Sequence, residues 1–221
     1  MSKGEYGDLE SIVEGISSMD IRGAGKVGRY ASGAISFLGR EYGGESRNEF
    51  ISILKRGAKK LMDTRPTAIS LKNSIILTLK DLEKEESVQD MKERLDVQSS
   101  RFIENSKKAV ERIAKVGAGS IPNRSTVLTH CNSNAALSVI ERGYREGRVE
   151  EVFCTESRPW RQGHITANRL AEQDIPVTMV VDSAVRHFIR EMDVVIVGAD
   201  TVAANGAVIN KIGTSQIALS A

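Results

Sequence analysis

A thiol and a carboxylate each follow a short apolar run in the second half of the chain. Cys131 comes after the run at 126–129, and Asp200 comes after the run at 194–197. Both runs are typical of buried strands, and the carboxyl ends of parallel strands open on one crevice where ligands bind. The spacing therefore predicts that Cys131 and Asp200 share a site, where a thiol and a carboxylate can act as an acid–base pair.

The residues after Cys131 favour a helix that begins beside the thiol. Asn132 or Ser133 can cap that helix, and the helix dipole is expected to lower the pKa of a nearby thiol. The alternative is a buried structural cysteine, which is the commoner state of this residue. Cys154 stands inside a predicted strand at 152–155, and there the structural role is favoured.

A glycine-rich turn near the start of the chain can bind an anion. Arg22, Gly23, Ala24 and Gly25 precede a predicted helix. The letters match a dinucleotide-binding fingerprint, but that motif needs a strand before its first glycine, and 12–19 has a helical pattern. Free backbone N–H groups at a helix start suit a phosphate. The alternative is an ordinary turn between helices.

Two further positions can bind an anion. Arg65 precedes Pro66, which ends a predicted helix, and a guanidinium there can hold a phosphate through two hydrogen bonds. The alternative is an isolated surface arginine. Asn210 and Lys211 place an amide and a cation beside another predicted helix start.

The histidines and cysteines do not form a metal-binding pattern. His130, Cys131, Cys154 and His164 show no CxxC or HxxxH spacing. Neither a metal nor a cofactor is therefore expected.

The first 120 residues have the periodicity of helices. Apolar residues recur at three- and four-residue spacing, and Asn48 can cap the third helix. A stretch with glycine and proline at 117–122 then separates a helical domain, 1–120, from a second domain, 121–221. The predicted helices cover roughly 12–19, 27–38, 48–62, 68–80 and 87–116.

The second domain alternates between strands and helices, which implies right-handed βαβ units and a Rossmann-like parallel sheet. The predicted strands are 126–129, 152–155, 177–181 and 194–197, and the helices between them are 135–142, 166–172 and 184–191. The last stretch, 212–221, resembles the opening turns of a helix without a cap. We expect a chain truncated from a protein of roughly 300 residues, with part of the sheet's cover missing.

Composition excludes several classes of function. With 27% charged residues and a net charge of +2, there is no electrostatic case for a nucleic-acid or membrane surface. Two cysteines without paired spacing, and no signal peptide, indicate a reducing compartment. No apolar run approaches the ~20 residues of a membrane span. These features predict a cytoplasmic protein with neither a nucleic-acid nor a membrane partner.

Several short motifs, in this order, resemble the superfamily of initiation factor 2B regulatory subunits and the related sugar-phosphate isomerases. Within it, the chain is most similar to the archaeal ribose 1,5-bisphosphate isomerases, which make ribulose 1,5-bisphosphate in AMP metabolism. The motifs extend over nearly the whole chain, and the last is highly specific. They stand at 22–25, 64–67, 129–131, 155–159 with 162–163, 198–200, 205–206 and 210–214.

The resemblance implies roles for individual residues. The catalytic pair falls on Cys131 and Asp200, and Asn134 departs from the archaeal pattern, which has lysine there. A sugar phosphate is the implied partner, and a homo-oligomer is implied because relatives assemble as dimers or larger rings. The implied substrate contacts are Arg22, Gly23, Ala24, Gly25, Arg65, Ser133, Asn134, Ala135, Asn210 and Lys211.

The chemistry of aldose–ketose conversion agrees with these groups. A proton can move from C2 to C1 through an enediolate, which needs a base at carbon and an acid at oxygen. A hydride shift also needs two groups, so both routes stay open. One alternative function is a non-catalytic initiation factor 2B-like regulatory subunit, which binds partner proteins and generally lacks the cysteine–aspartate pair. Another is a methylthioribose 1-phosphate isomerase, which has the pair but handles one phosphate.

Overall fold

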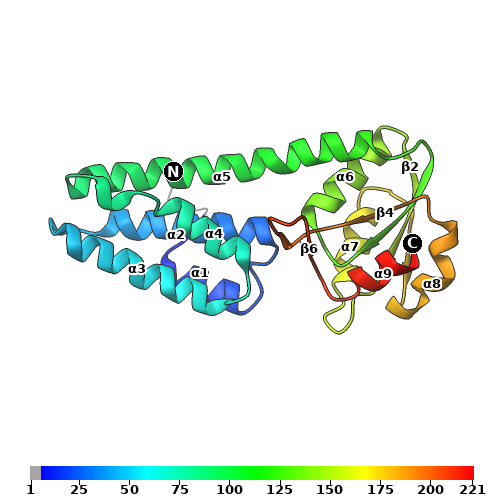
Figure 1. Ribbon diagram of the computed structural model, residues 1–221, viewed down its shortest axis with the longest axis horizontal. Helices are drawn as coiled ribbons and strands as arrows, with labels where there is room; N and C mark the ends of the chain where they lie inside the picture. The colour runs from blue at the N-terminus through cyan, green and yellow to red at the C-terminus, as the bar shows by residue number, and fades with distance from the viewer. Residues whose placement is uncertain (1–5) are drawn as a thin grey trace. The chain divides into compact units, whose positions relative to one another are not determined.

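The computed structural model describes residues 6–221, which form two compact units (Figure 1). The first unit ends at Lys107, and the second covers Lys108–Ala221. The long helix α5, Val88–Gly119, passes through this boundary and ends next to the predicted division at residue 120. The domain division at residue 120 stays a prediction.

The first unit consists of helices, as its apolar spacing predicts. The Asp8 carboxylate caps α1 by accepting from the Ser11 N–H at 3.0 Å, and Ser46 caps α3 by accepting from the Glu49 N–H at 3.3 Å. The expectation that Asn48 caps this helix is wrong, because Asn48 lies inside its first turn. The helices before α5 are α1 (Leu9–Ser17), α2 (Ala24–Glu41), α3 (Arg47–Thr64), α4 (Ile69–Thr78) and the short η1 (Leu82–Lys84).

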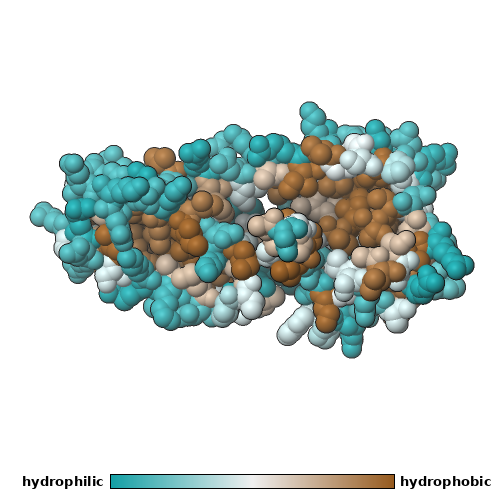
Figure 2. Space-filling view, viewed as in Figure 1, coloured by the Kyte–Doolittle hydropathy of each residue, from teal (hydrophilic) through white to brown (hydrophobic). Residues whose placement is uncertain are grey.

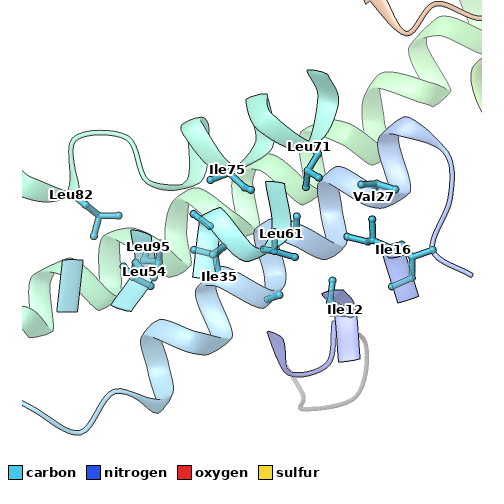
Figure 3. Close-up of a cluster of buried hydrophobic side chains, with 14 of the residues drawn as sticks. Ile12, Ile16, Val27, Ile35, Leu54, Leu61, Leu71, Ile75, Leu82 and Leu95 are labelled. Atoms are coloured by element: carbon cyan, nitrogen blue, oxygen red, sulfur yellow. The ribbon is translucent and has the colours of Figure 1, made fainter. Parts of the chain in front are cut away.

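One apolar cluster forms the core of this unit (Figure 3). Ile16, Ile35, Leu61, Leu71 and Leu95 come from five different helices and have 0% exposure. Burying each of these side chains contributes about 2 kcal/mol to folding. The helices are therefore held together mainly by apolar burial.

A buried group of hydroxyls joins α2 to its neighbours inside this core. Ser32 of α2 hydrogen-bonds Thr78 of α4 at 2.7 Å and Ser99 of α5 at 3.1 Å, and the Ser99 hydroxyl also donates to the Ser32 carbonyl at 3.0 Å. Buried hydroxyls need partners, and these find them in one another. These hydrogen bonds thereby fix the position of α2 along its own axis. The first residues of α2, Ala24 and Gly25, belong to the glycine-rich turn.

The long helix α5 has 32 residues and carries charged side chains along its length. In the described part of the chain, no helix is both long enough and apolar enough to cross a membrane.

The second unit is built on a parallel sheet of four strands, in the order β3-β2-β1-β4. Strand β1 (Ser125–His130) lies between β2 (Val149–Thr155) and β4 (Val194–Val197), and β3 (Val177–Val180) is one edge. The predicted α/β fold, with a helical part before a parallel sheet, is therefore present. The helices of this unit are α6 (Asn134–Arg145), α7 (Gln162–Ala171), α8 (Val185–Phe188) and α9 (Thr214–Ser220).

Two segments of this unit differ from the sequence-based expectation. The predicted helix at 184–191 is broken, because the four-residue α8 is flanked by the 3-10 turns η2 (Asp182–Ala184) and η3 (Ile189–Glu191). The glycine loop after Asp200 contains a short hairpin of β5 (Thr201–Val202) and β6 (Val208–Ile209).

Alternate residues of the strands supply two separate cores. Val127 and Val152 pack in one cluster, and their neighbours Leu128 and Phe153 pack in the other. Helices α6 and α7 contribute to the first cluster, whereas α8 and α9 contribute to the second, so helices pack on both faces of the sheet. At the β4 edge the strand is only half-buried, and Figure 2 shows apolar residues that reach the surface of this unit.

Cys154 provides a test of this packing through the pH dependence of stability. The side chain has 0% exposure, and burial raises the pKa of its thiol from 9.0 to about 11. Between these two pH values, unfolding releases a proton, so the free energy of unfolding should fall as the pH rises, by about 2 to 3 kcal/mol in total. Urea denaturation over this pH range measures the slope.

The matched variant is Cys154→Val, which keeps a small apolar side chain and removes the ionisable group. Its free energy of unfolding should depend less steeply on pH than that of the wild type. If the free energy of unfolding falls equally steeply with pH in the two proteins, burial of Cys154 does not raise the pKa of its thiol.

Candidate active site

The loop after β1 holds Cys131 in an unusual backbone conformation. Cys131 follows the last strand residue directly, with φ of 67°, and it is half-buried. Its N–H donates to the Ser157 hydroxyl at 2.8 Å, and its carbonyl accepts from the Thr166 hydroxyl at 2.7 Å. A non-glycine residue in this left-handed region persists where its surroundings hold it there. The backbone of Cys131 is therefore fixed by side chains from the loop after β2 and from α7.

Helix α6 begins three residues after the thiol. Ser133 caps it by accepting from the Ala136 N–H at 3.3 Å, which confirms one of the two predicted caps. Asn134 opens the helix, and the oxygen of its side-chain amide accepts from the Arg169 guanidinium at 2.7 Å. That guanidinium is also paired with the Glu141 carboxylate at 2.6 and 3.0 Å. Arg169 therefore fixes the orientation of the Asn134 amide, so that its NH₂ group faces away from Arg169.

The loops after β4 lie against the start of helix α6. A Cβ built on Gly198 would lie 2.6 Å from the Ser133 hydroxyl and 3.8 Å from the side-chain oxygen of Asn210. Only glycine fits such a close approach without a shift of its neighbours. The exposed Asp200 donates its N–H to the Ile209 carbonyl at 2.9 Å, which joins the two ends of the β5–β6 hairpin. Ser133, Gly198 and Asn210 thus meet at the carboxyl end of the sheet.

The electrostatics of the thiol connect Cys131 to Asp200 and Lys211. Burial is the largest influence and raises the pKa of the Cys131 thiol above its ordinary value of 9.0. The Asn132 N–H and the charge of Lys211 lower this pKa, while the charge of Asp200 raises it. The expectation that the helix start lowers the thiol pKa overall is wrong, because desolvation outweighs the favourable groups. The resting thiol is therefore protonated at neutral pH.

The other predicted anion-binding residues belong to the first unit. Gly23, with φ of 85°, precedes α2, and the residues Arg22 to Gly25 are exposed. Arg65 ends α3 and is half-buried, and its carbonyl accepts from the Ala68 N–H at 3.0 Å. Within residues 6–221, neither arginine makes a side-chain hydrogen bond or ion pair. The guanidiniums of Arg22 and Arg65 are thus available to an anion.

Sequence reasoning missed the residues that support the thiol loop. Thr166 and Arg169 lie on α7, and Gly163 of the same helix packs so closely that a Cβ on it would lie 1.9 Å from the Thr155 carbonyl oxygen. Asp182 accepts from the N–H groups of Ser157 and Arg158 at 2.8 and 2.7 Å. The motif at 155–159 signalled this loop, but the partners of its backbone groups have no sequence spacing that reveals them.

The possible metal ligands weighed from the sequence do not gather. Across residues 6–221, no group of three or more His, Cys, Asp and Glu side chains could hold a metal ion. Cys154 is buried within β2, and His164 lies 3.9 Å from the Glu156 carboxylate.

Comparison with known proteins identifies the same family as the sequence motifs do. A family model described as the initiation factor 2 subunit family matches residues 20–221. The chain is 46% identical to ribose 1,5-bisphosphate isomerase from Methanocaldococcus jannaschii over 213 residues, which cover 96% of this chain and 68% of that protein.

Solved structures with the same fold include an enzyme and a translation factor. The chain superposes on 5-methylthioribose 1-phosphate isomerase from Pyrococcus horikoshii with a TM-score of 0.82 at 25% identity, covering 96% of this chain and 63% of that one. For the delta subunit of initiation factor eIF-2B from A. fulgidus, the TM-score is 0.77 at 30% identity, with 96% and 66% covered. The chain spans about two thirds of the length of these relatives. The resemblance predicted from the motifs is thus confirmed, and the chain belongs to the initiation factor 2 subunit family.

Proposed function

We propose that this chain acts in a sugar-phosphate isomerase that converts ribose 1,5-bisphosphate to ribulose 1,5-bisphosphate. The observation that carries the proposal is the Cys131 thiol, which lies at the carboxyl end of β1 within electrostatic reach of both Asp200 and Lys211. The 46% identity to an archaeal enzyme of that name supports the substrate. A thiol, a carboxylate and a cation at one sheet end are the groups that this reaction needs.

The proposed chemistry divides acid and base work between Cys131 and Asp200. The Cys131 thiol is protonated at rest because burial raises its pKa, so it can donate a proton to the substrate. The Asp200 carboxylate is exposed and can accept one. The charge of Lys211 stabilises the thiolate that remains after donation. Proton transfer through an enediolate and a hydride shift both use two such groups, and the proposal covers both routes.

The substrate's two phosphates require cations and N–H donors. Lys211 makes no ion pair among the described residues, and neither do Arg22 and Arg65. An unpaired cation can form charge-assisted hydrogen bonds to a phosphate without first breaking an ion pair. The proposed contacts are Arg22, Gly23, Ala24, Gly25 and Arg65 in the first unit, and Ser133, Asn134, Ala135, Asn210 and Lys211 in the second.

A non-catalytic regulatory subunit is the alternative function. Its support is the similarity to the delta subunit of initiation factor eIF-2B from A. fulgidus, at 30% identity. Binding of protein partners alone requires neither a thiol nor a carboxylate beside it, whereas isomerase chemistry requires both. The association of copies into a homo-oligomer also stays a prediction, which light scattering of the purified protein measures.

The catalytic pair is tested by two substitutions. Cys131→Ser and Asp200→Asn should each leave the protein folded but lower kcat by at least ~100-fold, the scale of a lost general acid or base. NMR of the protein incubated with ribose 1,5-bisphosphate follows the conversion of aldose to ketose. Asp174→Asn, at an exposed turn after α7, is the matched control and should keep full activity. Near wild-type turnover by either active-site variant would remove that residue from the mechanism.

The phosphate contacts are tested by ligand binding. Lys211→Met and Arg22→Ala should each weaken binding of a five-carbon bisphosphate by about 10- to 100-fold, because a hydrogen bond to a charged group contributes roughly 1.5 to 3 kcal/mol. Binding of the matching neutral sugar should change much less. Calorimetry measures both ligands, with the exposed Lys72→Met as the control for loss of one positive charge. Equal losses for the bisphosphate and the neutral sugar would place these residues outside the phosphate sites.

A further inference from the structure

The side chain of His130 connects three separate segments of the second unit. It is the last residue of β1 and is only 2% exposed. Its Nδ1 hydrogen-bonds the Thr155 hydroxyl at the end of β2, and its Nε2 hydrogen-bonds the Ile212 carbonyl at 2.7 Å. The imidazole therefore links the end of β1, next to Cys131, to the end of β2 and to the loop that carries Lys211.

The partners of His130 determine its tautomer. A backbone carbonyl can only accept, so the bond to Ile212 requires a proton on Nε2. In the neutral ring Nδ1 is then an acceptor, and the Thr155 hydroxyl donates to it. The Ser157 hydroxyl lies 3.3 Å from the same nitrogen and accepts from the Cys131 N–H. Every polar atom of the imidazole is thus used to hold neighbouring segments.

The loop after Lys211 is shaped to fit this ring. Gly213 has φ of 102°, and a Cβ built on it would lie 2.9 Å from both Nε2 and Cε1 of His130. A contact this short is not tolerated, so the backbone lies against the imidazole only because residue 213 has no side chain. The position of this loop therefore depends on His130 through a hydrogen bond and through direct packing.

We propose that His130 is a positioning residue that holds the Lys211 ammonium near the Cys131 thiol by binding the Ile212 carbonyl. Lys211 immediately precedes Ile212, so a displacement of this carbonyl moves the lysine as well. The charged groups that act on the thiol are Lys211 and Asp200, and only Lys211 favours the thiolate. The catalytic part of this role rests on the proposed function. The effect of the Lys211 charge on the Cys131 thiol can be measured without any reaction.

The measurement is the pH midpoint of Cys131 alkylation by iodoacetamide, followed by mass spectrometry of the digested protein, which separates the Cys131 peptide from that of Cys154. His130→Ala and Lys211→Met should each shift this midpoint to higher pH, because each deprives the thiolate of the lysine charge. The double variant, with both His130→Ala and Lys211→Met, should shift the midpoint no further than Lys211→Met alone. His187→Ala, at an exposed histidine, should leave it unchanged. An unshifted midpoint in either single variant, or shifts that add in the double variant, would overturn the proposal.

A pair of amide variants separates positioning from general loss of packing. The amide nitrogen of His130→Gln reaches about as far as Nε2 and can still donate to Ile212, whereas that of His130→Asn reaches only as far as Nδ1. The Gln variant should keep a midpoint near that of the wild type, and the Asn variant should resemble His130→Ala. Equal midpoints for the Gln and Asn variants would overturn the role of the Ile212 bond.

Gly213→Ala displaces the loop without altering the histidine. It should shift the midpoint of Cys131 alkylation to higher pH, as Lys211→Met does. The control is Gly147→Ala, which should leave the midpoint unchanged. Gly147 also has a positive φ, of 71°, but no atom lies within 4 Å of a Cβ built there.

In isomerase assays, His130→Asn should lose about 100-fold in kcat/KM, the cost of misplacing a reacting group by about 1 Å. If the protein is an active isomerase but the variants do not shift the alkylation midpoint as expected, only the positioning role is rejected. If the midpoints shift as expected but the protein has no isomerase activity, only the proposed function is rejected.

Discussion

The pairing of β1 with strands on both of its sides is the constraint from which the site follows. Thr129 pairs with Cys154 of β2 and with Ile196 of β4, and His130 pairs with Val197. The segments that continue from these strands, which begin with Cys131 and Gly198, are therefore brought to the same end of the sheet. A slip of one residue in this register would turn every strand side chain to the opposite face. The two apolar clusters on the sheet faces prevent that slip, so the apolar core positions the polar site.

The chemistry of the site depends on a balance between burial and charge. Burial favours the neutral Cys131 thiol, the Lys211 charge favours the thiolate, and Asp200 opposes it. None of the three effects can be judged alone, because a buried thiol without a cation is inert and an exposed one ionises in the same way as a free cysteine. The pKa of the Cys131 thiol therefore depends on where the loop with Lys211 lies as well as on which residues are present.

Periodicity and turn chemistry predicted the order of the elements, because those patterns follow from which faces are buried. The helical part, the four parallel strands and the cap by Ser133 were all accessible in this way. The positions of Cys131 and Asp200 directly after two predicted strands also predicted that both lie at the same end of the sheet. Whether these residues and the predicted contacts act on a substrate stays a prediction.

What could not be predicted depends on contacts between segments far apart in the sequence. The support of Cys131 by Ser157 and Thr166 joins residues 26 and 35 positions apart, and no spacing rule reveals such pairs. The sign of the thiol pKa shift was wrong for the same reason, since desolvation depends on everything packed around the group. His130 was weighed as a metal ligand because the sequence shows its type and not its neighbours.

The close approach of α7 to the sheet limits how this site can evolve or be engineered. Because the Gly163 backbone touches the Thr155 carbonyl, any side chain at position 163 would move α7 away from the sheet. The helix would take Thr166 and Arg169 with it, and the thiol loop would lose both supports at once. A mutational library aimed at this site therefore has to keep glycine at position 163, because any side chain there would separate α7 from the loop that carries Cys131.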